Sequence, residues 1–149
     1  MPRIERSATI VWEGNLARGS GRLSAASSGA FSGLAFSNAS RIGNPEGKTS
    51  PEELLAAAHG GCFTTSLAGE LTSLGHPPER LELSCRIIMD EVEGQGHQIV
   101  GSQIQVAATV DGIDEETFQK GVALAHAGCP FSALLERASA TVEIDARLF

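Results

Sequence analysis

The sequence is short of positive charge, of cysteine and of long apolar runs, and each shortage excludes a class of protein. Eleven Lys and Arg residues stand against 18 Asp and Glu, which gives a net charge of −7. Binding to a phosphate backbone needs clustered basic side chains, so a nucleic-acid partner is not expected. No apolar run approaches the roughly 20 residues that a membrane-spanning helix needs, so no membrane role is expected either.

The first residues are basic but are not followed by the apolar segment of a secretory signal. We therefore expect a cytoplasmic protein. In that compartment a permanent disulfide is disfavoured, and paired cysteines more often bind metal, catalyse or undergo redox chemistry. The total of three cysteines is odd, which also argues against a purely structural disulfide framework.

Length and composition predict one soluble globular domain over residues 1–149, with 42% hydrophobic and 19% charged residues. The first third is rich in glycine and in β-type alternation. It predicts short strands at residues 7–12, 22–26 and 30–36, followed by a loop at residues 41–49.

The clearest helix start in the chain follows that loop. Ser50 can be the N-cap, Pro51 suits the first helical position, and Glu53 completes a capping box. Apolar residues then occur on nearly every side of the helix, so we expect it to be buried. It should end near Gly75, because two prolines follow shortly after.

The remainder of the chain alternates strand and helix patterns. Strands are predicted at residues 81–89 and 99–110, helices at 114–127 and 130–137, and a last strand at 141–148. Gly128 is expected to stop the first of these two helices. Strands and helices in this order predict an α+β domain.

Two cysteines lie in matching local contexts. Cys62 and Cys129 each follow a glycine, and each has a histidine three residues before it. This parallel setting suggests a working pair of thiols. Cys129 lies close to the start of the last short helix, where the helix dipole and free N–H groups favour a thiolate. Cys62 lies within the long helix and becomes reactive only if a cation reaches it.

The remaining cysteine and the two histidines have simpler interpretations. Cys85 lies on the apolar face of its strand, which favours a place in the core. His59 and His126, each with its cysteine, could provide the four ligands of a zinc site, and a Cys–His hydrolase is a further alternative. The spacing is generic, and a core histidine is favoured for His59.

At these residues the sequence resembles the OsmC/Ohr family, the osmotically inducible and organic hydroperoxide resistance proteins. The resemblance covers nearly the whole chain, and its most specific segments are residues 48–63 and 127–130. Trp12-Glu13-Gly14 and Arg41 are closer to the OsmC branch than to the Ohr branch.

The family implies an OsmC-like α+β fold, with strands around a long buried central helix, in an intertwined homodimer. It implies a thiol-dependent peroxidase that reduces organic hydroperoxides, and hydrogen peroxide less well, without cofactor or metal. The match assigns the peroxide attack to Cys62 and the resolving role to Cys129. It assigns the activating cation to Arg41, with Arg18 as the alternative, and the partner of that arginine to Glu52.

The implied partners are an organic hydroperoxide and a dithiol reductant, for example of the lipoyl type. Candidate apolar surroundings that suit an alkyl peroxide are Phe31, Phe36, Phe63 and Phe131. A cysteine-based redox sensor and a Cys/His zinc-binding protein without turnover remain alternatives. Turnover of a hydroperoxide with a dithiol, and metal analysis, would separate these classes.

The spacing of Glu52 and Cys62 raises a further expectation. They are ten positions apart, which on one continuous helix is a rise of ~15 Å. A single arginine cannot easily contact both groups at that separation. Two antiparallel copies of the helix, packed through the small residues 56–61, would bring them into one site. The alternative is a break at Gly60-Gly61, where glycines replace the alanines usual in the family.

Overall fold

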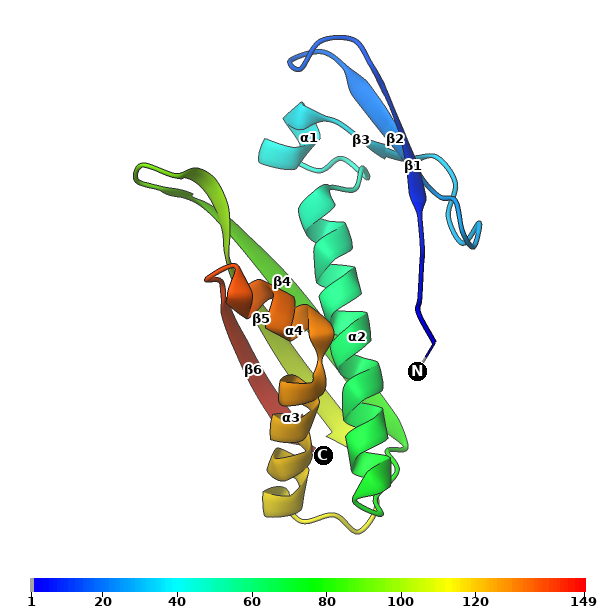
Figure 1. Ribbon diagram of the computed structural model, residues 1–149, viewed down its shortest axis with the longest axis vertical. Helices are drawn as coiled ribbons and strands as arrows, with labels where there is room; N and C mark the ends of the chain where they lie inside the picture. The colour runs from blue at the N-terminus through cyan, green and yellow to red at the C-terminus, as the bar shows by residue number, and fades with distance from the viewer. Residues whose placement is uncertain (1) are drawn as a thin grey trace. The chain divides into compact units, whose positions relative to one another are not determined.

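The computed structural model describes residues 2–149, which divide into two compact units (Figure 1). One unit runs to Pro51 and the other from Glu52 to Phe149. Each unit has its own three-stranded sheet. The prediction of an α+β chain is confirmed, whereas a single domain over residues 1–149 stays a prediction.

The first unit is built on a small antiparallel sheet. Its strands are β1 (Ala8–Glu13), β2 (Ser20–Ala25) and β3 (Leu34–Phe36), in the order β1-β2-β3. The first two strands lie within two residues of the predicted ranges. The third is shorter than predicted, because Gly29 and Gly33 adopt positive φ angles of 67° and 68° and form turns before it.

A glycine allows two aromatic rings to meet on this sheet. Gly21 of β2 pairs with Trp12 of β1 on one side and with Phe36 of β3 on the other. A side chain at Gly21 would overlap the Phe36 ring. The two rings instead approach to 5.5 Å between centroids across this position.

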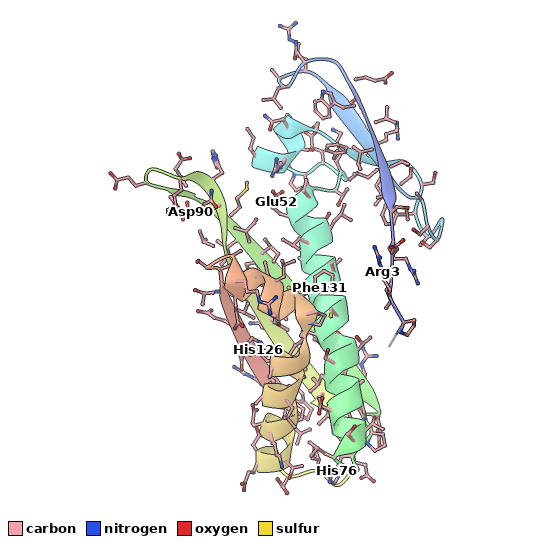
Figure 2. All side chains as sticks on the ribbon, viewed as in Figure 1. Arg3, Glu52, His76, Asp90, His126 and Phe131 are labelled. Atoms are coloured by element: carbon pink, nitrogen blue, oxygen red, sulfur yellow. The ribbon has the colours of Figure 1, made fainter. Side chains whose placement is uncertain are left out.

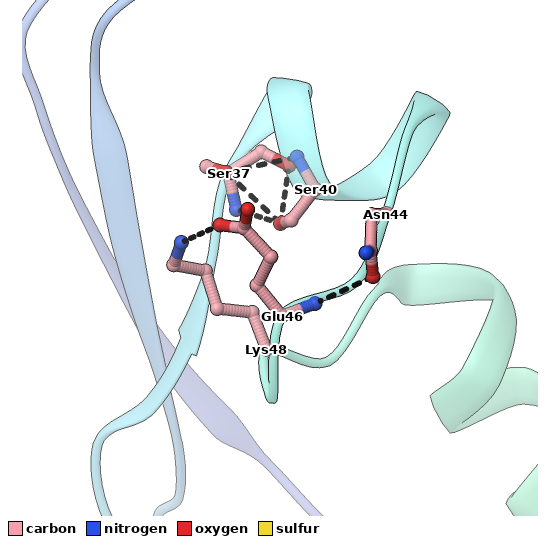
Figure 3. Close-up of polar contacts among 5 residues, drawn as sticks. All are labelled: Ser37, Ser40, Asn44, Glu46 and Lys48. Atoms are coloured by element: carbon pink, nitrogen blue, oxygen red, sulfur yellow. Dashed lines mark hydrogen bonds and ion pairs between the residues drawn. The ribbon is translucent and has the colours of Figure 1, made fainter.

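A short helix, α1 (Asn38–Ile42), lies where a loop was expected to begin. Ser37 and Ser40 form a reciprocal capping box at its start, so the prediction that Arg41 belongs to a loop is wrong (Figure 3). The pattern was missed because serine, rather than Glu or Gln, closes the box. In the loop that follows, Lys48 pairs with Glu46 at 3.7 Å.

The second unit is organised by one long helix, α2 (Pro51–Ser73). It begins at the predicted residue and ends just before Gly75, whose φ of 88° takes the chain out of the helix. The helix is continuous through Gly60 and Gly61, so the alternative of a break there is wrong.

Helix α2 is not buried on every side within the single chain. Its fully buried side chains follow at intervals of four residues and form one face: His59, Phe63, Leu67 and Leu71. Ala57, Gly61 and Thr65 are exposed. The expectation of an all-round buried helix is therefore not met by this chain alone.

Three strands and two helices complete the second unit. The strands are β4 (Arg80–Val92), β5 (Gly96–Thr109) and β6 (Thr141–Leu148), in the order β4-β5-β6. Strands β4 and β5 form a long antiparallel hairpin, whereas β5 and β6 are parallel. The helices are α3 (Glu115–Gly128) and α4 (Pro130–Arg137), which form the crossover between β5 and β6.

The helix boundaries place a cysteine at a junction. Helix α3 runs through Gly128, one residue further than predicted, and Cys129 is both its C-cap and the N-cap of α4. Asp114 caps the start of α3, with its side chain accepting from the Thr117 N–H at 2.7 Å. The core of this unit includes the buried residues Phe63, Phe118 and Ile104. Among the residues described here, no helix has both the length and the apolar character needed to cross a membrane.

Candidate functional site

The fold brings Cys62 and Cys129 together. Their sulfur atoms are 3.5 Å apart, although 67 positions separate them in the chain. Cys62 comes from the middle of α2 and Cys129 from the α3–α4 junction. Figure 2 shows Phe131, at the start of α4, beside the middle of α2. The two cysteines that the sequence suggested as a working pair thus lie in contact, while their disulfide and their separate roles stay predictions. None of the three cysteines is in a disulfide.

Cys129 lies where several donors converge. Burial opposes its ionisation, but the N–H and hydroxyl of Ser132, the Cys62 thiol and the Phe131 N–H outweigh it and lower the pKa of Cys129. The Ser132 N–H donates to the sulfur at 3.5 Å, as expected of an N-cap position. This environment favours a thiolate at Cys129.

Cys62 has the opposite environment within the second unit. Burial raises the pKa of its thiol, and the hydrogen bond with Cys129 raises it further, while the Phe131 N–H opposes this only in part. Of the two thiols, Cys129 is therefore the one that loses its proton more easily. Helix α2 supplies no free N–H group at its middle, so a cation from elsewhere is needed to ionise Cys62.

Solvent exposure favours the other cysteine. Cys129 is only 1% exposed, whereas Cys62 is half-buried. An incoming molecule can therefore reach Cys62 more readily than Cys129. Ease of ionisation and ease of access thus belong to different cysteines.

A buried polar network lies behind Cys129. The ring nitrogens of His59 contact the Ser102 hydroxyl at 2.7 Å and the Ser132 hydroxyl at 2.8 Å. All three residues are fully buried. Burial lowers the pKa of His59, and the nearby His126 lowers it further, so the ring is neutral.

The sequence pattern indicated His59 but neither serine. Ser132 could have been recognised, because it stands three residues after the N-cap Cys129, where a capping partner belongs. Ser102 gave no signal, since it is one small polar residue within an otherwise apolar strand face. Its hydroxyl also lies 3.5 Å from the sulfur of Cys85. Cys85 packs against the core, as its place on the strand predicted.

The histidines do not form the zinc site considered from the sequence. Both nitrogens of His59 are engaged by serines. His126 Nε2 lies 2.9 Å from a Glu136 carboxylate oxygen. Within residues 2–149, no group of three or more His, Cys, Asp or Glu side chains is arranged to hold a metal ion.

The predicted arginine lies in the first unit and the cysteines in the second. Arg41 lines an apolar pocket of about 190 Å³ whose other walls include Trp12, Leu16 and Phe36. Arg18 does not line this pocket. An arginine at the edge of an apolar pocket could hold a negatively charged group beside an alkyl chain.

Glu52 is not close to Cys62 along the helix of its own chain. It lies in the first turn of α2, ten residues before Cys62 on an unbroken helix (Figure 2). Of the four predicted site residues, the second unit therefore brings two together and leaves Glu52 apart from them. Among the predicted apolar residues, Phe63 is a fully buried core residue, so it is not free to contact a substrate.

Known proteins are similar to this chain in both sequence and fold. A family model described as OsmC-like protein matches residues 43–145. The chain is 32% identical over 145 residues to the peroxiredoxin OsmC of Escherichia coli K12, covering 97% of each protein.

Solved structures also match the fold. An OsmC-like protein from Mycoplasma pneumoniae matches with a TM-score of 0.76 at 11% identity over 97% of each chain. An organic hydroperoxide resistance protein from Elizabethkingia anophelis matches with a TM-score of 0.74 at 18% identity over 100% of each chain. The mixed fold with two small sheets is that of OsmC and Ohr structures, and the chain belongs to the OsmC-like family.

Proposed function

We propose that this protein is a thiol peroxidase that reduces organic hydroperoxides, with Cys62 as the attacking cysteine and Cys129 as the resolving one. The observation that carries this proposal is the 3.5 Å separation of the two sulfurs. Such a pair needs only a small movement to form a disulfide. The similarity to a peroxiredoxin over 97% of the chain supports peroxide chemistry in particular.

The proposed reaction has three balanced steps. The Cys62 thiolate attacks the terminal oxygen of the hydroperoxide, the O–O bond breaks, and the alkoxide leaves with a proton as an alcohol. The Cys129 thiolate then attacks the sulfenic sulfur, and the S–O bond breaks to release hydroxide, which takes a proton as water. A dithiol reduces the disulfide by exchange and is itself oxidised to a disulfide.

Accessibility supports Cys62 as the attacking residue. A hydroperoxide must reach the sulfur that it oxidises, and Cys129 is only 1% exposed. The lowered pKa of Cys129 suits a resolving residue, because such a residue must ionise but need not be reached by a molecule from solvent. In the competing assignment Cys129 attacks the peroxide first. The lowered pKa of Cys129 favours this assignment, whereas the burial of Cys129 argues against it.

Arg41 is the proposed cation that ionises Cys62. A guanidinium stabilises both the thiolate and the charge that develops on the leaving oxygen. The apolar pocket beside Arg41 would take the alkyl group of the peroxide. Glu52 is proposed to orient this arginine.

We further propose that the protein is a homodimer with sites shared between chains. Helix α2 exposes small residues, among them Ala57 and Gly61, beside a groove of about 390 Å³ against β4. In the first unit, Ile10 and Val11 of β1 are 57% and 62% exposed. Apolar surface of this kind favours association. The proposed location is the cytoplasm, where reduced thiols persist.

One experiment tests the cysteine chemistry directly. The reduced protein is treated with one equivalent of cumene hydroperoxide, and its peptides are mapped by mass spectrometry. We expect a single new linkage between Cys62 and Cys129, with Cys85 remaining a thiol. A bridge that contains Cys85, or no bridge at all, contradicts the proposal.

A second measurement separates an enzyme from a sensor. Consumption of hydroperoxide is followed with an excess of a dithiol such as dihydrolipoamide. A peroxidase consumes many equivalents, whereas a redox sensor stops after one. Glutathione serves as the monothiol control for the reductant class.

A further inference from the structure

Two side-chain contacts join helix α2 to the start of α4, and they have the same spacing on both segments. Cys62 meets Cys129 with their sulfurs 3.5 Å apart. His59 meets Ser132, with Nε2 2.8 Å from the hydroxyl oxygen. The two residues on α2 are three positions apart, and so are the two at the start of α4. Because residues three apart on a helix are neighbours on its surface, the two contacts lie next to each other.

The His59 ring is also held from its other side. Its Nδ1 lies 2.7 Å from the Ser102 hydroxyl, so the ring connects α4 to strand β5 from a position on α2. His59, Ser102 and Ser132 are all fully buried, which keeps water from competing for these contacts. A hydroxyl can donate or accept, so both contacts are satisfied whichever ring nitrogen has the proton. One side chain therefore ties three elements together.

The residue that His59 holds on α4 is also the one that contacts the Cys129 sulfur. The backbone N–H of Ser132 donates to that sulfur at 3.5 Å, while the Ser132 hydroxyl contacts His59. A shift of the first turn of α4 would therefore disturb both contacts together. A disulfide needs its two sulfurs ~2.05 Å apart with a narrow range of dihedral angles, so its formation depends on where this turn lies.

We propose that His59 is a positioning residue, which fixes the first turn of α4 against α2 and so sets how the Cys129 sulfur approaches that of Cys62. It acts through Ser132, and Ser102 holds the ring in place. The effect is one of proximity, because groups that are held in a reacting geometry react far faster than groups that must find it.

In the catalytic cycle this role belongs to the closure of the disulfide, and this part rests on the proposed function. Loss of the His59 contact should leave the attack of Cys62 on a hydroperoxide little changed. It should slow the attack of Cys129 on the sulfenic sulfur. The sulfenic acid would then persist for longer, and dimedone would trap more of it.

The deciding measurement needs no peroxide. The protein is equilibrated with mixtures of reduced and oxidised dithiothreitol, and peptide mapping gives the fraction that has a Cys62–Cys129 disulfide. Each closure passes two electrons and two protons to oxidised dithiothreitol, whose S–S bond becomes two thiols. The equilibrium constant reports how readily the two sulfurs meet within the folded chain, and it is defined whether or not the protein is a peroxidase.

Two conservative replacements make this test specific for the contact with α4. The amide of glutamine reaches the position of Nε2 of histidine, whereas the shorter asparagine reaches only that of Nδ1. His59→Gln can therefore still bind Ser132, while His59→Asn keeps only Ser102. We expect the equilibrium constant for disulfide closure to fall about tenfold in His59→Asn and in Ser132→Ala, but about threefold at most in His59→Gln.

Gln119→Ala is the matched control, because it removes a hydrogen bond between two other elements of the same unit. The Gln119 side chain on α3 donates to the Ala146 carbonyl of β6 at 3.0 Å, and it also donates to Glu115 within its own helix. This variant should lower the melting temperature and leave the disulfide equilibrium unchanged. It therefore shows what a loss of packing alone does.

The outcomes separate positioning from packing. If His59→Asn lowers the melting temperature but leaves the equilibrium constant unchanged, the role is structural and the proposal is wrong. Equal losses in His59→Gln and His59→Asn would also overturn it, because the contact with Ser132 would then not matter. If neither histidine variant folds, Ser132→Ala decides, since it removes one hydroxyl and keeps the backbone N–H to the sulfur. If peroxide is not turned over while these constants fall as expected, the proposed function fails and the positioning role stands.

Discussion

At the scale of single residues, the second unit separates two properties that a reactive thiol normally combines. Cys129 is surrounded by donors that lower the pKa of its thiol, yet it is 1% exposed. Cys62 can be reached, yet burial and its neighbour raise the pKa of its thiol. A nearby cation would lower the pKa of Cys62, and Arg41 is the candidate that the family resemblance supplies.

The first prediction follows from this division. Cys129→Ser should consume one equivalent of hydroperoxide and accumulate a sulfenic acid at Cys62, because the attacking thiol remains and its resolving partner is gone. Cys62→Ser should consume none. Dimedone labelling followed by peptide mapping measures both. A labelled Cys129 in Cys62→Ser would reverse the two roles.

At the scale of the elements, the sequence predicted helices α2, α3, α4 and strand β6 to within about two residues at each boundary. These segments have strong local signals, such as the Ser-Pro-Glu-Glu start of α2 and the proline that opens α4. Helix α1 was missed because it is one turn long and capped by serines. The matched contexts of Cys62 and Cys129 pointed to a working pair, and their sulfurs do lie 3.5 Å apart. The partners of His59 were not, because contacts between distant segments leave no mark in local patterns.

A second prediction concerns the packing of α2 on β4. A Cβ at Gly60 would lie 3.1 Å from the Cβ of Cys85, whereas a Cβ at Gly69 would meet nothing within 4 Å. Gly69→Ala should stabilise the protein by about 1 kcal/mol through helix propensity alone. Gly60→Ala should not be stabilised, because the close contact with Cys85 offsets the gain in helix propensity. Denaturant unfolding measures both, and equal stabilisation would show that β4 gives way easily.

The cap of α3 gives a third prediction, which depends on pH. Hydrogen bonds from Thr117 hold the pKa of Asp114 below its usual value, so the ionised carboxylate stabilises the folded state. That stabilisation is complete above the ordinary carboxyl pKa of about 4 and is lost as the pH falls through the lower folded-state pKa. Asp114→Ala should therefore unfold more easily at pH 7.

The same comparison in acid serves as the control for this effect. Below the folded-state pKa the carboxyl is neutral in both states, so the difference between the two proteins should shrink. Asp114→Asn, which can still cap the helix, should show little change with pH. A difference that stays constant from pH 7 to pH 3 would contradict the assignment.

At the scale of the whole molecule, two features favour a second chain. Helix α2 is continuous, so Glu52 and Cys62 stay ~15 Å apart along it. In addition, the six residues of β1 are all exposed within the single chain. Two antiparallel copies of α2 would bring the start of one helix near the middle of the other, which would account for the first feature.

Mixed dimers test this arrangement and provide the fourth prediction. Glu52→Ala and Cys62→Ser should each be inactive, but unfolding and refolding them together should restore activity. If subunits mix at random and each mixed dimer has one intact site, about a quarter of wild-type activity is expected. Each mutant refolded alone is the control, and a mixture as inactive as its parts would contradict shared sites.

The contact between Cys62 and Cys129 also bears on the unfolded chain. A bond between these two residues would close a loop spanning 67 positions and remove much of the freedom that the denatured ensemble otherwise has. On loop-entropy grounds this corresponds to roughly 4 kcal/mol. We expect the peroxide-treated protein to require more denaturant to unfold than the dithiol-treated one, with Cys129→Ser showing no such difference. Each catalytic cycle would then pass through a disulfide form that resists unfolding. Under peroxide stress a larger fraction of the protein would be in this more stable oxidised form.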